Sequence, residues 1–428
     1  MGLIGRICCF SLMRSPSKST NHPEDFQPEI IGADEEDFQP PPEITMGAGE
    51  EESQPVPLPN LPPEITFEIL SRLTVKSLLR LRCVCKSWRS LISGREFAKT
   101  HLSLASSIDT DYAHHRLLIT SPFAVVMSCS LYSILDEHSD TDVVELDYPL
   151  YGDGCGGHLG VRVLGCCDGL VCVETKSTLC LWNPSTRKSK RLPSVNLPHG
   201  HGVVYGFGYD SSIDDYKVVG FLYGHSGIDF EVKVYTLRTD SWRRIGDFPY
   251  GDLPYRHSSG VFVNAALHWN VGGEPNGIIV SLDLAKETYG EILKPEYRDG
   301  RLYETLCDFN GCLCELYDYR ICAHVWVMKE YGIRDSWTKL AVVPYVTRVS
   351  NLQYTMPFSI FKNGEVLLYT RKHLVRYNPK DGTFIYPTCP IDLASSILHP
   401  YIESLVSVDM DADKGVPCAP ILKGIKEL

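Results

Sequence analysis

The sequence contains no run of about 18 apolar residues, so it offers no helix long enough to cross a bilayer. Among its 16 cysteines there is no C-x₂-C pair, the spacing from which most structural zinc sites are built. It also has no glycine-rich phosphate loop and no nucleophile elbow. These absences argue against a membrane-spanning protein, a zinc protein and the common motif-bearing enzyme classes, and we expect no metal and no cofactor.

Lys and Arg are absent from positions 22–60, which contain eleven Asp and Glu and many Pro and Gln. Such a segment cannot bury enough apolar surface to offset its chain entropy, so we expect a disordered acidic tail over residues 1–56. Residues 1–60 carry a net charge of −8 out of −12 for the whole chain, which leaves only −4 for the rest. A nearly neutral body argues against a nucleic-acid-binding surface.

The cysteines, in a chain with no signal peptide, indicate a reducing compartment, so we expect the cytoplasm, the nucleus or both. The N-terminus leaves a second possibility open. Gly2 is placed for myristoylation, and Cys8 and Cys9 for palmitoylation, which together would anchor the protein to a membrane. Arg6, however, stands where the myristoylation pattern has Ser or Thr. We expect membrane association only if this end is lipidated.

Residues 61–93 are predicted to form three short helices. Pro62 and Pro63 suit the first turn of a helix, and Ile65, Ile69 and Leu73 repeat at the spacing of one helical face. Thr74 can cap the second helix, and the third carries Trp88. So small a unit cannot hide this many apolar side chains, and small domains usually need help to be stable. The alternatives are a partner protein or an ordinary helical cap on the domain that follows.

This stretch resembles the F-box family through its Leu-Pro-Pro-Glu-Ile opening, Ile-Leu-Ser-Arg-Leu, Val-Cys-Lys-Ser-Trp and closing Leu-Ile. In that family the module docks on a Skp-type adaptor and thereby joins a cullin-based SCF ubiquitin ligase. The resemblance implies an F-box over residues 57–104, with a last helix from about residue 95. The adaptor-facing residues that it implies are Leu61, Pro62, Ile65, Ile69, Leu70, Leu73, Leu78, Leu81, Val84, Cys85 and Trp88.

From about residue 115 the sequence consists of short apolar runs split by Gly, Asp, Asn and Ser, which is typical of β-strands. A strand, a polar turn and a second strand recur at intervals of 46 to 53 residues. A kelch blade repeats at about 50 residues. The recurring positions are Tyr132, Trp182, Tyr235, Leu282, Met328 and Tyr377.

Six repeats, each preceded by another strand pair around a tight turn, predict an α + all-β chain with a six-bladed β-propeller over residues 105–410. The strand-like segment 401–408 is left over and would close the ring, and residues 411–428 would form a tail. Short strands alone do not fix an architecture, so a two-sheet sandwich stays open as the alternative.

The second domain also resembles the plant F-box-associated interaction domain, through runs such as Gly165–Leu170 with Trp182–Arg187 and Tyr205–Asp210 with Asp214–Val219. The likeness is strongest toward F-box/kelch-type plant proteins, which include a negative regulator of immunity, and next toward S-locus F-box proteins. The paired glycines and spaced Tyr and Trp of true kelch repeats are missing. The propeller is therefore predicted from the period alone.

Two clusters contain residue types that are typical of catalytic or metal sites. His199 and His201 flank Gly200 in a pattern that can hold a metal, and Asp214 with Asp215 can pair as acid and base. Neither has a partner set at a sensible spacing. The two aspartates lie between strands, where Asp is favoured for its local hydrogen bonds. We therefore expect no intrinsic catalysis.

These observations and the two resemblances together predict a non-catalytic substrate receptor of an SCF-type ligase, with a non-degradative scaffold as the alternative. Its partners would be a Skp-type adaptor, a cullin through that adaptor, and an unidentified target protein. Blade-to-blade connections are longer than the hairpin turns and carry the aromatic and Arg side chains that anchor protein interfaces. The predicted target contacts on them are Tyr250, Tyr255, Arg256 and Tyr303.

Overall fold

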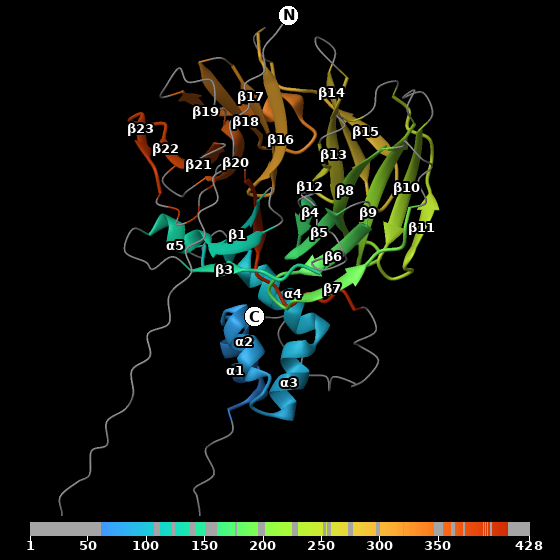
Figure 1. Cartoon of the computed structure of the whole chain (residues 1–428), viewed down its shortest axis with the longest axis vertical. Coiled ribbons are helices and arrows are strands. Elements are labelled where there is room, and N and C mark those ends of the chain that lie inside the picture. Colours follow the sequence, from blue (N-terminus) through green and yellow to red (C-terminus); the bar gives the residue numbers. More distant parts are fainter. Residues whose placement is uncertain are drawn as a thin grey trace, which may run out of the picture. The chain divides into compact units, whose positions relative to one another are not determined.

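The computed structural model describes residues 61–409 except for several gaps, the longest being 150–160, 346–353 and 196–201, followed by 107–111, 137–141 and 225–229. The tail predicted for residues 1–56, with Gly2, Cys8 and Cys9, lies outside the described residues, as do 410–428. The described residues form a helical module, defined here as α1 to α4, followed by six four-stranded antiparallel sheets (Figure 1). The sheets surround a common centre in chain order, which is a six-bladed propeller and not a sandwich.

The helical module begins as the sequence predicts. The first two helices are α1 (Pro63–Ser71) and α2 (Val75–Leu81), and the next two are α3 (Lys86–Ser93) and α4 (Arg95–Ala105). Prolines occupy the first turn of α1, where a missing N–H costs little. Thr74 caps α2 by accepting a hydrogen bond of 3.4 Å from the Ser77 N–H. The boundaries of this part therefore follow from local sequence signals.

Each of the first three blades contains four strands, which pair with their neighbours in the order from first to fourth. Blade 1 contains β24 (Ile397–Ile402), β1 (His115–Thr120), β2 (Val126–Ser130) and β3 (Val143–Glu145). Blade 2 contains β4 (Arg162–Cys167), β5 (Leu170–Thr175), β6 (Thr178–Asn183) and β7 (Lys188–Arg191). Blade 3 contains β8 (Gly202–Asp210), β9 (Asp215–Tyr223), β10 (Phe230–Thr236) and β11 (Ser241–Arg244).

The other three blades repeat this order. Blade 4 contains β12 (Val261–Val263), β13 (Ala266–Val271), β14 (Ile278–Asp283) and β15 (Tyr289–Ile292). Blade 5 contains β16 (Tyr303–Phe309), β17 (Cys312–Asp318), β18 (Cys322–Met328) and β19 (Trp337–Pro344), with the short 3₁₀ helix η1 (Arg334–Ser336) before β19. Blade 6 contains β20 (Tyr354–Ile360), β21 (Val366–Thr370), β22 (Leu374–Asn378) and β23 (Thr383–Ile385).

Two predictions about blade 1 need correction. The region around Tyr132 is not a strand but the short helix α5 (Leu131–Leu135), whose first turn is capped by the Ser130 hydroxyl. The aligned strand of this blade is β2, which ends just before it. The segment that closes the ring was predicted at 401–408, but the closing strand is β24, which ends at Ile402 and pairs antiparallel with β1. Ring closure itself is confirmed.

Each blade has two distinct ends. In blades 2 to 6 the hairpin end joins the first strand to the second and the third to the fourth, mostly by short turns, whereas the connecting end joins the second to the third and one blade to the next. In blade 1 the first strand is β24, which meets β1 at ring closure. The hairpin end holds most of the positive-φ residues, including the pairs Asp168–Gly169 and Asn310–Gly311. Such left-handed pairs make the two-residue turns that suit twisted hairpins. These turns were predicted from the Asp-Gly and Asn-Gly dipeptides.

Neighbouring blades interlock through aromatic side chains that fill space left by glycine. Gly260 lies beside Gly206 in a short parallel bridge between blades 3 and 4, and its N–H donates 2.7 Å to the Tyr205 carbonyl. The fully buried Trp269 ring covers both glycines, because a Cβ at Gly260 would lie only 2.5 Å from its Cζ2 atom. The two blades can approach this closely only because neither position has a side chain.

Blade 5 contains a buried charged cluster next to its connection from blade 4. The Lys294 ammonium lies 2.6 Å from Glu304 Oε1 and 3.6 Å from Glu315 Oε1. Glu315 is completely buried and accepts a hydrogen bond of 3.1 Å from the Tyr317 hydroxyl. Burial raises the pKa of Glu315 to about 7, and the charge of Glu304 adds to the rise while Lys294 opposes it.

This raised pKa predicts a stability that depends on pH. The folded state holds the Glu315 proton more tightly than the unfolded chain does, so the contribution is fully present below pH 4.5 and is lost as pH rises through 7. Glu315→Gln should remove that slope and stabilise the protein above pH 7 by on the order of 1–3 kcal/mol. Thermal unfolding between pH 5 and 8 measures it. Glu330→Gln, at an exposed position, is the control, and an unchanged slope in Glu315→Gln would contradict the prediction.

Candidate functional site

The helical module exposes several large apolar side chains. Leu61, Ile65, Ile69 and Val84 keep 56%, 47%, 48% and 61% of their surface exposed, although the module has a core of its own. Pro62 and Cys85 are exposed as well. A monomer gains nothing from leaving such a group in water, and contiguous exposed apolar residues usually mark an interaction site. These residues are the strongest candidate for a docking surface.

The other predicted adaptor-facing residues lie deeper. Leu73, Leu81 and Trp88 are half-buried, whereas Leu70 and Leu78 have 1% and 0% of their surface exposed. Those two belong to the core of the module, which is formed by Phe67, Leu70, Leu78, Ile92 and Phe97. In this structure they support the exposed face from beneath and offer no surface of their own. Periodicity predicted that all of these residues are apolar positions of one unit, but it could not separate core from surface.

The start of α3 explains why Val84 is so exposed. The Cys85 sulfur accepts a hydrogen bond of 3.4 Å from the Trp88 N–H, so Cys85 is the capping residue and Val84 lies before the helix. The sequence pattern predicted that the third helix includes Val84. This is wrong, because α3 begins two residues later, at Lys86. The correction leaves Val84 on the surface, next in sequence to the exposed Cys83 and Cys85.

The charge of the module differs from that of the whole chain. Residues 61–105 contain eight Lys and Arg but only three Glu, a net charge of +5 in a chain of −12. Arg80, Lys86 and Arg89 are exposed and flank the apolar residues of α2 and α3 in sequence. A positive border around an apolar centre favours a partner with acidic groups around its own apolar surface.

The module is fixed to blade 3 by an ionic contact. Asp214, in the turn between β8 and β9, lies 2.9 Å from the Arg95 guanidinium and 2.8 Å from the Lys99 ammonium, both on α4. Tyr209 also donates a hydrogen bond to it. Burial alone would raise the pKa of Asp214, but the hydrogen bonds from Lys99 and Tyr209 and the charge of Arg95 outweigh it and lower the pKa.

Asp214 lies in the turn between β8 and β9 as predicted, whereas Asp215 was also predicted in that turn and is the first residue of β9. The Asp215 carboxylate accepts a hydrogen bond of 2.9 Å from the Arg238 N–H across the blade. Asp214 faces α4 as described above. Sequence reasoning missed this second role, and its only sequence signal is the spacing of Arg95 and Lys99, which places two cations on one face of a helix.

A second contact joins the module to blade 1. The Nε2–H of His101, on α4, donates a hydrogen bond of 2.8 Å to the Leu73 carbonyl, and the ring stands edge-to-face on the His114 ring at 5.3 Å. Both contacts are at the hairpin end of the propeller, since His114 directly precedes β1 and Asp214 lies in a hairpin turn. The module therefore engages blades 1 and 3 at this end and leaves the connecting end open.

One of the predicted target residues is exposed to solvent at the connecting end. Tyr303, at the start of β16, is 62% exposed. Leu302 beside it and Ile321, in the turn between β17 and β18, are 43% and 76% exposed. Sequence reasoning missed Leu302 and Ile321, which a search for apolar residues beside polar turns would have found. Together with Tyr303 they form an exposed apolar group at one end of blade 5.

Of the other predicted target residues, one is half-buried and two lie outside the described residues. Tyr250 is half-buried, and its ring packs edge-to-face on Phe248 at 5.1 Å, which makes it partly a core residue. Tyr255 and Arg256 lie outside the described residues. The prediction for this surface therefore rests on Tyr303 and stays a prediction.

The described ranges contain no group of three or more His, Cys, Asp or Glu placed to bind a metal ion. His199 and His201 lie outside these ranges. Within them there is also no helix with the length and apolar character of a membrane span.

Comparison with known proteins gives consistent results for both parts of the chain. The model of the F-box domain matches residues 58–100, and that of the F-box associated beta propeller domain matches residues 125–385. An F-box/kelch-repeat protein of Arabidopsis thaliana is 36% identical over 360 residues, which cover 81% of this chain and 96% of that protein. The F-box protein CPR1 of the same organism is 32% identical over 343 residues, covering 72% of this chain and 79% of its own.

Proposed function

The chain belongs to the family of F-box proteins with an F-box-associated β-propeller, and from this premise we propose that it is the substrate-recognition subunit of an SCF-type ubiquitin ligase. Like other proteins of this kind it is not an enzyme. In this proposal the helical module, which is the F-box, binds a Skp-type adaptor and through it a cullin. The propeller holds a target protein, and its contribution to ubiquitin transfer is to raise the effective concentration of target lysines near the conjugating enzyme.

The observation that supports adaptor binding most strongly is the exposed apolar face of the F-box. Leu61, Ile65, Ile69 and Val84 are each about half exposed in a module that buries Leu70 and Leu78 completely. Transfer of such surface out of water contributes about 25 cal/mol per Å² of apolar area. An apolar centre with basic residues around it matches the anatomy of a specific interface.

The two ends of the blades support the assignment of the target surface. The F-box is bound at the hairpin end through Asp214 and His114. A target that bound there would compete with the F-box for space, whereas the connecting end carries longer connections and the exposed Tyr303, Leu302 and Ile321. We therefore propose that the target binds at the connecting end, with blade 5 contributing an apolar contact.

Partner abundance in cells tests the proposal against a non-degradative scaffold. Deleting α1 to α3 should raise the level of the captured protein, because the propeller would then hold it without delivering it for ubiquitination. A scaffold would leave that level unchanged. Capture with the F-box-deleted propeller and with the intact chain, compared with and without a proteasome inhibitor, identifies the target and decides between the two.

The target surface makes a separate prediction. Tyr303→Ala should weaken capture of the target about ten-fold or more, because a largely exposed tyrosine at an interface centre typically contributes 1–2 kcal/mol or more. Binding of the adaptor should not change. The matched control is Tyr132→Ala, which removes a tyrosine that is 44% exposed on α5 at the hairpin end. Loss of capture in the Tyr132 variant with normal capture in the Tyr303 variant would place the target at the opposite end.

A further inference from the structure

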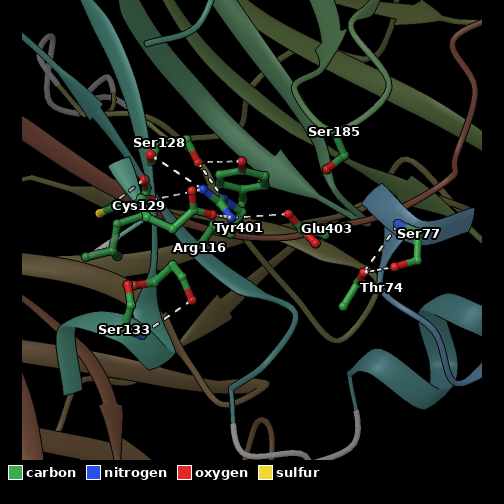
Figure 2. A network of polar contacts seen from close by, with 12 residues as sticks. Thr74, Ser77, Arg116, Ser128, Cys129, Ser133, Ser185, Tyr401 and Glu403 are labelled. Atoms are coloured by element: carbon green, nitrogen blue, oxygen red, sulfur yellow. Dashed lines mark hydrogen bonds and ion pairs between the residues drawn. The ribbon is translucent and has the colours of Figure 1, made fainter. Parts of the chain in front are cut away.

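The last described residues of the chain lie between the two domains. We call residues 403–409 the closing segment, because they directly follow β24, the strand that closes the ring. Figure 2 shows where the segment begins, with Glu403 beside the Arg116 guanidinium, which also reaches Ser128 on β2. The closing segment contacts both the propeller and the F-box, and within the described ranges Leu405 is the propeller residue that packs on the F-box core described above.

Alternate residues of the closing segment face the propeller. Asn183, at the end of β6, donates hydrogen bonds of 3.1 Å to the Ser404 carbonyl and 2.8 Å to the Val406 carbonyl. Ser404 and Val408 are completely buried, and Val408 belongs to the core of blades 2 and 3. The Glu403 N–H donates 2.8 Å to the His114 carbonyl, which extends the pairing of β24 with β1. The segment is therefore held in place by closure of the ring.

The intervening residue faces the F-box. Leu405 packs on the core formed by Phe67, Leu70, Leu78, Ile92 and Phe97. In an extended segment successive side chains point to opposite sides, so holding Ser404 and Val406 on the propeller directs Leu405 into the helices. The F-box core thus receives a side chain from a position more than 300 residues further along the chain.

This contribution matters because the F-box is small. The described helices span about 45 residues, close to the size below which a domain needs help to be stable. The cluster at its core consists of five buried apolar side chains, so one more leucine is a large fraction of the packing. Leu70 and Leu78 in that core lie beneath the exposed adaptor-facing residues.

We propose that the closing segment couples closure of the propeller to the adaptor-binding ability of the F-box. Until β24 has paired with β1, Leu405 is not held against the helices, and their core is incomplete. A chain with an open ring then has a loosely packed F-box and binds the adaptor poorly. Only receptors with a complete propeller enter the ligase. This inference rests on the proposed function for its last step, whereas the structural coupling does not.

The test uses the full-length protein with a purified Skp-type adaptor. Leu405→Asp should speed amide hydrogen exchange in α1 to α3 at least ten-fold and weaken adaptor affinity at least ten-fold, with exchange in blade 5 unchanged. Ile397→Asp places the same charge at a 57% exposed position on β24, at the connecting end, and should change neither. Unchanged exchange and affinity in Leu405→Asp would overturn the proposal.

A second variant replaces a residue of blade 2 and leaves every residue of the F-box and Leu405 in place. Asn183→Ala removes the hydrogen bonds that hold the closing segment, and it should also speed exchange in α1 to α3 and weaken adaptor binding. Asn378→Ala is the matched control, since Asn378 occupies the equivalent turn of blade 6, where its carbonyl oxygen accepts a hydrogen bond of 3.0 Å from the Lys380 N–H. Equal effects of the two variants would overturn the coupling. If the wild-type chain fails to bind the adaptor, the proposed function is wrong, and hydrogen exchange still decides this inference.

Discussion

Replacing Ile69 by aspartate is expected to abolish binding of the Skp-type adaptor. Ile69 is 48% exposed on α1, four residues after the exposed Ile65 and next in sequence to the core residue Leu70. In a docked complex an aspartate at this position would be an unpaired charge in an apolar interface, at a cost of several kcal/mol. A loss of that size corresponds to at least a hundred-fold in affinity. The helix itself should form normally, because the position faces solvent in the free chain.

Titration calorimetry with purified adaptor measures the affinity of Ile69→Asp and of a control variant. Ile321→Asp is the control, since Ile321 is 76% exposed but lies at the connecting end of blade 5. It should bind the adaptor as the wild type does. Replacing Leu61 and Pro62 together by alanine should give a smaller loss, because it removes contact area without burying a charge. Undiminished adaptor binding by Ile69→Asp would contradict the F-box docking surface described here.

The second large effect is expected in the propeller, from adding a single methyl group. Gly260→Ala would place a Cβ 2.5 Å from Trp269 Cζ2 and 2.6 Å from its Cε2, on a strand that is bridged to Gly206. The indole is fully buried and cannot move aside without displacing Phe221, with which it packs edge-to-face at 4.9 Å. Overpacking of this kind costs about 3 kcal/mol. The melting temperature should fall by about 5–10 °C.

Gly246→Ala is the matched control, because a Cβ at Gly246 meets no atom within 4 Å. Its melting temperature should stay close to that of the wild type. Shortening the ring with Trp269→Phe should make room, so Gly260→Ala should cost less in that background than alone. Equal costs in both backgrounds, measured by denaturant unfolding, would show that Trp269 is not the obstacle.

Much of the fold could be predicted because its signals are local or periodic. Proline in the first turn and the Thr74 cap place the helices, and Asp168-Gly169 and Asn310-Gly311 mark hairpin turns. The repeat of about 50 residues then gives the blade count. The same method misplaced the first repeat, because Ser130-Leu131-Tyr132-Ser133 has a strand-like composition but its first serine caps the helix α5. Local composition cannot decide between a cap and a strand residue when the segment is this short.

The candidate sites were predictable only in part, for a different reason. The F-box pattern identifies Leu70 and Ile69 equally, but their exposures of 1% and 48% depend on how the helices pack. The contribution of Leu405 has no local signal, because it depends on Asn183 holding its neighbours from blade 2. Contacts between residues so distant in sequence leave no periodic trace in a single sequence. Tyr303 was predicted from its place in a long connection, and its exposure agrees with that reasoning.

The separation of the two blade ends has a consequence for how such a receptor can change over evolutionary time. The hairpin end is constrained twice, since its turns need left-handed residues such as Gly169 and Gly311, and Asp214 there also holds α4. Among the described residues the connecting end has only two positive-φ glycines, Gly272 and Gly300, and the ionic contact with α4 lies at the other end, so insertions and substitutions there cost less stability. In the proposed function, drift at the connecting end after gene duplication gives a new target, while the attachment of the F-box at the hairpin end is inherited unchanged. One scaffold can serve many receptors in this way.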